Sequence, residues 1–185
     1  MFYVSLGIIL CIFSASLFLR RRRFWLRFVK ISFLFSFLAV FLFLSILSLI
    51  QFYLWSQSDF SRYLLPPHQP INYFLFYVSI RFFAPYLISA AGALIFLCLA
   101  RYFNKKHEGK FFESEEPYFG AVGVFLAGWP GFLFYIVFLL IFYLLIHLNS
   151  LFAIHNSSNR ISLYWLWLPA AIFVIIMNNY VIQNW

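Results

Sequence analysis

The sequence has 185 residues, of which 65% are hydrophobic and only 10% are charged. A soluble domain carries about 25% charged residues, so this chain has too little polar surface to cover a globule in water. The formal net charge of +8 comes from bases in short loops beside apolar runs. That pattern is typical of membrane orientation and excludes a nucleic-acid partner, so we expect an integral membrane protein whose main surroundings are the lipid bilayer.

Two spanning helices are predicted in the N-terminal region, residues 1–54. Phe2 to Leu19 is an apolar run just long enough to cross. The arginines at 20–23, with Arg27 and Lys30, follow it and predict a cytoplasmic loop, with the N-terminus outside. Ile31 to Leu54 has 24 residues and no charge, enough for a second crossing of about 36 Å.

A polar loop with Asp59, Arg62 and three prolines precedes an ambiguous apolar run, Ile71 to Phe103. A continuous helix of this length would measure about 50 Å, too long for a bilayer core of about 30 Å. We expect Arg81 and Pro85 to divide the run. The second part, Ala84 to Ala100, is a span, whereas residues 71–83 lie in the interface, re-enter the membrane or cross at a thinned site.

The C-terminal half is predicted to add three further helices. The bases of residues 101–110 indicate a second cytoplasmic loop. Pro117 then opens a short apolar helix that ends at Gly128-Trp129-Pro130-Gly131. Apolar helices at 132–148 and 161–182 complete the chain. The sequence therefore predicts one domain over 1–185, an all-α polytopic transmembrane bundle with five or six crossings, in the inner (cytoplasmic) membrane.

Acidic residues are few, and four of the five lie between Asn104 and Gly131. Two facing carboxylates can share a proton and activate water, one as base and one as acid. The candidates are Asp59 and the pair Glu115 and Glu116. The alternative is that these are solvated loop acids, or acids that favour the start of a helix.

Other reactive side chains give no second candidate. The four histidines lack metal-ligand spacing, and Cys11 and Cys98 both lie inside apolar segments, so neither a metal site nor a cofactor is expected. Arg81 is the one cation at possible membrane depth. It is either functional or reaches to a nearby interface along its aliphatic stem.

The stretch from Glu116 to the Gly128–Gly131 element resembles the core of the prepilin (type IV) peptidases. In that family a G-x-G-D motif lies at the cytoplasmic mouth of a short glycine-containing helix, which often ends in a G-W-P-G-like element. Here Glu116 occupies the place of the aspartate. Asp59, which precedes Pro66 by several residues, resembles the other family aspartate, and the run from Ile161 to Phe173 resembles the closing helix. The similar region is residues 59–182.

The resemblance implies an intramembrane aspartyl protease that cleaves the leader of a prepilin-like membrane peptide, with Asp59 and Glu116 as catalytic residues. The G-x-G-D glycines are absent, and glutamate replaces aspartate at 116. The orientation of the loops puts Asp59 outside and Glu116 inside, unless residues 71–83 cross the membrane by themselves. We therefore expect a divergent or catalytically inactive relative. The alternative is a non-enzymatic scaffold, envelope-assembly or transport component.

Overall fold

The computed structural model describes residues 1–19, 24–107, 112–152 and 164–183. These residues form helices and no strand, which confirms the all-α prediction. The predicted bases Arg20–Arg23 and Lys110, and the predicted start of the last span at Ile161, lie outside the described residues. The elements are α1 (Phe2–Leu19), α2 (Trp25–Gln57), η1 (Ser61–Leu64), α3 (Ile71–Val78), η2 (Ser79–Phe83), α4 (Ala84–Lys106), α5 (Glu116–Ala127), α6 (Gly131–Phe152) and α7 (Tyr164–Gln183).

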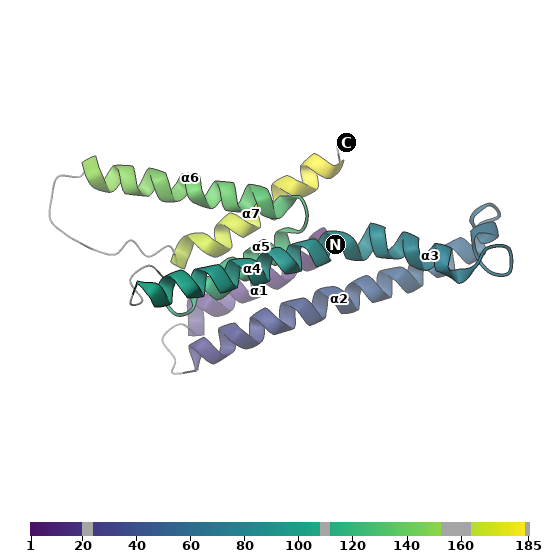
Figure 1. The fold of residues 1–185 in the computed structure, drawn as a ribbon, viewed down its shortest axis with the longest axis horizontal. Helices are drawn as coiled ribbons and strands as arrows, with labels where there is room; N and C mark the ends of the chain where they lie inside the picture. Colours follow the sequence, from purple (N-terminus) through teal and green to yellow (C-terminus); the bar gives the residue numbers. More distant parts are fainter. Residues whose placement is uncertain (20–23, 108–111, 153–163, 184–185) are drawn as a thin grey trace.

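The short helix α5 is the centre of the bundle, and all twelve of its residues are buried. Helices α1, α2, α4, α6 and α7 pack around it. Figure 1 shows that the chain runs back and forth along one direction, so successive long helices are antiparallel. It also shows α2 and α3 reaching well beyond the ends of α1, α5 and α7. We call this extension, residues 45–85, the protruding hairpin.

The expected division of the 71–103 run is wrong, because α3, η2 and α4 form one uninterrupted helix from Ile71 to Lys106. Pro85 has no N–H for the carbonyl of Arg81, and its ring crowds that carbonyl. The helix absorbs this by widening over one turn, with the Ala84 N–H donating to the Ser79 carbonyl five residues back. Pro85 therefore loosens the helix without ending it, and the whole rod measures about 54 Å.

Glycines let bulky aromatic side chains press against the backbone of α5. A Cβ at Gly120 would clash with the Phe96 ring of α4 and would lie 2.8 Å from Cζ3 of Trp167 on α7. A Cβ at Gly123 would lie 2.5 Å from the Cζ of Tyr135 on α6. Tyr135 is fully buried, and its hydroxyl donates to the Trp167 carbonyl at 3.1 Å. Gly120 and Gly123 therefore allow the neighbouring helices to pack closely against α5.

Helix α5 ends at Gly128, as the sequence predicts, and α6 begins at Gly131. Gly128 has φ +67° and ψ 170°, a conformation that only glycine adopts readily. Asn178 of α7 donates from Nδ2 to the Ala127 carbonyl at 3.3 Å, which satisfies one terminal carbonyl of α5. This turn therefore reverses the chain beside the C-terminal half of α7.

The outer faces of the helices are apolar. On α2, a stripe of exposed side chains recurs every three or four residues, opposite a buried stripe that faces the core. The exposed members include Leu34, Leu38, Leu42, Ile46 and Leu49. Two helices, Trp25–Gln57 and Ile71–Lys106, are long and apolar enough to cross a membrane, and three shorter apolar helices accompany them. Burying such a surface requires lipid or another apolar partner.

Candidate functional site

The start of α5 is held in place by two reciprocal pairs of hydrogen bonds. Asn104 of α4 donates from Nδ2 to the Phe112 carbonyl at 3.0 Å, and its Oδ1 accepts from the Phe112 N–H at 3.1 Å. Four residues after Phe112, Glu116 donates its N–H to the Glu113 carbonyl, and its carboxylate accepts from the Glu113 N–H, both at 3.2 Å. The second pair has the i, i+3 spacing of a capping box. The first pair thereby holds Phe112 at the end of α4.

Glu116 is only 2% exposed, although it is the first residue of α5. The N-terminus of a helix carries a partial positive charge, which favours a carboxylate at this position. Pro117 follows it and needs no hydrogen-bond acceptor at the first turn. The sequence-based alternative, an acid that favours a helix start, therefore describes what the Glu116 side chain does here.

Two cations flank the next aromatic ring of α5. The guanidinium carbon of Arg101, on α4, lies 4.6 Å from the ring centroid of Tyr118, and the Nζ of Lys30, on α2, lies 5.9 Å from it. Both distances are within the range of cation–π attraction. Tyr118 is itself buried, at 6% exposed. Sequence reasoning missed this cluster, whose only sequence signal is a base near the end of each of two apolar runs.

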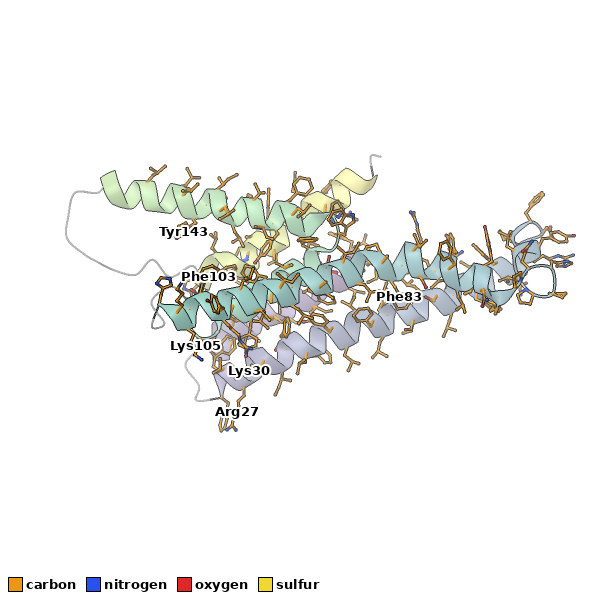
Figure 2. The ribbon with its side chains drawn as sticks, in the orientation of Figure 1. Arg27, Lys30, Phe83, Phe103, Lys105 and Tyr143 are labelled. Carbon is orange, nitrogen blue, oxygen red and sulfur yellow. The ribbon has the colours of Figure 1, made fainter. Side chains whose placement is uncertain are left out.

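The described basic residues of α2 and α4 lie together at one end of the molecule, which we call the basic end. Figure 2 shows Arg27, Lys30 and Lys105 together there. The exposed bases of the basic end that the structure describes are Arg27, Lys30, Arg101, Lys105 and Lys106. The described bases of the two predicted loops lie on helices instead: Arg27 and Lys30 are on α2, and the others are on α4. Both groups lie at the same end of the bundle as the start of α5.

Asp59 lies at the opposite end of the molecule. It is an exposed residue in the turn between α2 and η1, at the tip of the protruding hairpin (Figure 1). The 36-residue helix Ile71–Lys106 separates this tip from the basic end, a length of about 54 Å. Carboxylates that share a proton are about 3 Å apart. The structure therefore does not bring Asp59 and Glu116 together, and residues 71–83 belong to the same continuous helix as residues 84–106.

The other reactive side chains considered in the sequence analysis do not lie together with Glu116. Arg81 is exposed on η2, in the protruding hairpin. Cys11 and Cys98 are exposed free thiols on α1 and α4. Within the described ranges, no three histidine, cysteine or acidic side chains are grouped as metal ligands would be. Glu116 thus accepts a hydrogen bond from the Glu113 N–H and lies two residues before the cation-flanked Tyr118, and Asp59, the other acid of the predicted pair, is not near it.

Comparison with known proteins found no match to a protein-family model, a curated protein or a solved structure.

Proposed function

We propose that this chain is a catalytically inactive, prepilin-peptidase-like protein of the inner (cytoplasmic) membrane, which crosses the bilayer several times and acts as a scaffold for other membrane-embedded helices. The observation that carries the proposal is the separation of Asp59 from Glu116 by the length of a helix of 36 residues. The other support comes from the apolar exterior and from the basic end.

The membrane location follows from what the exterior can contact. Leucine and isoleucine side chains on the outward stripe of α2 are half to two-thirds exposed, and α6 is similar at Phe134 and Leu140. Such surfaces are stable in hydrocarbon and associate in water. Six passes follow if α1, α2, the helix from Ile71 to Lys106, α5, α6 and α7 each cross once. With 12 residues, α5 reaches only about 18 Å, and the surrounding helices shield it from lipid.

The orientation follows from the distribution of bases. Five described bases lie at the basic end, while the tip of the protruding hairpin carries Arg62 beside Asp59. Lysine and arginine in short loops favour the cytoplasmic side. We therefore place the basic end and Glu116 in the cytoplasm, with Asp59 outside.

An aspartyl protease mechanism has no support in this arrangement. Such a mechanism needs one protonated and one ionised carboxyl group across a shared water. Glu116 is instead buried and bonded to the Glu113 N–H, and Asp59 lies in another compartment in the proposed orientation. A protein with an apolar exterior, and with no such pair among the residues that the structure describes, is suited to hold helices. Its proposed partners are the lipid bilayer and a prepilin-like membrane peptide.

The test is co-expression with a pilin precursor in a host that lacks its own prepilin peptidase. We expect the leader to stay attached in the presence of this chain, and the precursor to co-purify with it from membranes. An active prepilin peptidase in the same host is the positive control, and the amount of this chain in the membrane fraction must match it. Leader removal would overturn the proposal; its loss in Asp59→Asn or Glu116→Gln would further implicate that acid.

A further inference from the structure

The two cations beside Tyr118 lie at the same depth of the bundle, although they come from different helices. Lys30 immediately precedes the uncharged run of α2, and Arg101 immediately follows the uncharged run of α4. Both side chains are exposed, and Figure 2 shows Lys30 at the basic end together with Lys105. In the proposed orientation, both cations therefore lie where the hydrocarbon of the cytoplasmic leaflet meets its head groups.

The Tyr118 ring brings these two like charges close together. The Arg101 guanidinium lies 4.6 Å from the ring centroid and the Lys30 ammonium lies 5.9 Å from it, and both α2 and α4 pack against α5, which carries the ring. Like charges held in this way repel each other. An anion that contacts both cations removes the repulsion, so the arrangement favours a negatively charged ligand.

Three acids, in the segment 113–116, also lie at the basic end, against five described bases. The Glu116 carboxylate accepts the Glu113 N–H at the start of α5. Within the part of the chain that the structure describes, neither Lys30 nor Arg101 forms an ion pair with an acid. The basic end therefore keeps an excess of positive charge, and its two cations beside Tyr118 are open to an outside anion.

The helix faces that carry the two cations continue as apolar, exposed surface. Leu34 lies four residues after Lys30 on α2 and is 67% exposed, and Leu94 lies seven residues before Arg101 on α4 and is 49% exposed. Residues at these spacings share a helix face. A phospholipid can place its phosphate at the cations and its acyl chains on this surface, whereas a soluble anion would use only the cations.

We propose that Lys30 and Arg101 bind the phosphate of one anionic phospholipid of the cytoplasmic leaflet, such as phosphatidylglycerol. The planar guanidinium of Arg101 donates two hydrogen bonds to phosphate oxygens, and the Lys30 ammonium contacts the same group from α2. Tyr118 is a positioning residue, because its ring holds both cations at one place. The inference rests on the proposed membrane location, and it adds a lipid that joins α2 to α4 across the start of α5.

The test is native mass spectrometry of the purified full chain in detergent, with an equimolar mixture of dioleoyl phosphatidylglycerol and dioleoyl phosphatidylcholine. The two lipids share their tails and their phosphate, but the choline cation cancels the charge of the phosphate. Each base near an anionic lipid contributes roughly fivefold in affinity, so we expect about fivefold or greater preference for the glycerol lipid. The double variant Lys30→Gln and Arg101→Gln should lose this preference.

The matched control is the double variant Lys105→Gln and Lys106→Gln, which removes the same charge from the same end but leaves the cations beside Tyr118 in place. It should keep most of the preference. Tyr118→Leu should lower the preference without a change of charge, and Tyr118→Phe, which keeps the ring, should restore it. Equal binding of the two lipids by the parent protein, or an equal loss in both double variants, overturns the inference.

Glycerol 3-phosphate distinguishes a lipid site from a site for soluble phosphates, because it has the anionic group without acyl chains. At equal concentration it should not displace phosphatidylglycerol, and displacement would contradict the assignment to a lipid. The lipid measurement and the test of leader cleavage are independent. A loss of lipid preference with an intact leader would make only the lipid site wrong, and leader removal with lipid preference retained would make only the proposed function wrong.

Discussion

A Gly123→Ala variant is expected to be less stable than the parent protein by about 1–3 kcal/mol. Alanine favours a helix over glycine by about 1 kcal/mol, so the clash must exceed that gain. At Gly123 the new Cβ would meet the Tyr135 ring, with the Cζ at 2.5 Å. Tyr135 cannot give way easily, because it is fully buried and its hydroxyl is bonded to the Trp167 carbonyl.

Gly7→Ala is the matched control, because a Cβ at Gly7 on α1 would meet nothing within 4 Å. Here only the helix propensity acts, and the variant should gain about 0.5–1 kcal/mol. Both free energies of unfolding are measured by denaturant titration of the purified proteins in the same detergent. If Gly123→Ala is as stable as the parent, the packing of α6 against α5 described above is wrong.

Replacing Glu116 with methionine is expected to cost about 1.5–3 kcal/mol, because the variant keeps the length of the side chain but loses a charged acceptor. Glu116 is 2% exposed, and it accepts the Glu113 N–H at the start of the central helix. The Glu116→Gln variant replaces the carboxylate by a neutral amide whose oxygen still accepts a hydrogen bond. Its stability should therefore fall between those of the parent and Glu116→Met.

Asp59→Leu is the companion measurement, since it also replaces an acid by an apolar side chain of similar size. Asp59 is exposed at the tip of the protruding hairpin, so the free energy of unfolding should change by no more than about 0.5 kcal/mol. The combined variant should show additive effects, because sites more than about 10 Å apart rarely couple. Strong coupling between the two positions would contradict their placement at opposite ends.

The sequence predicted the apolar helices and the Gly128–Gly131 turn, because both are local signals. It did not predict that the bases beside the apolar runs continue the helices, with α2 beginning at Trp25 and α4 extending to Lys106. It failed at residues 71–106, where Pro85 suggested a division. Whether a proline ends or only loosens a helix depends on whether the surrounding structure compensates the lost hydrogen bond. Here one turn of the helix, η2, is wider than an α-helical turn, and the helix then continues.

The candidate site was predictable only in part, for a related reason. The position of Glu116 at the start of a helix was visible from Pro117 and the apolar run that follows. The basic runs already favoured its separation from Asp59. The pattern left open a separate crossing by residues 71–83, because it did not show that the helix continues through Pro85. The Tyr118 cluster requires the ends of α2, α4 and α5 to meet, and a single sequence carries no signal for contacts at such long range.

The central claim is that Asp59 and Glu116 lie on opposite sides of the membrane. Cysteine labelling in intact cells tests this claim most directly. Cys11 and Cys98 are first replaced by serine, and single cysteines are then introduced as Asp59→Cys and Lys105→Cys. A membrane-impermeant maleimide should label position 59 in intact cells, but position 105 only after the membrane is permeabilised. Labelling of both positions from the same side would contradict the proposed orientation and would return the two acids to one compartment.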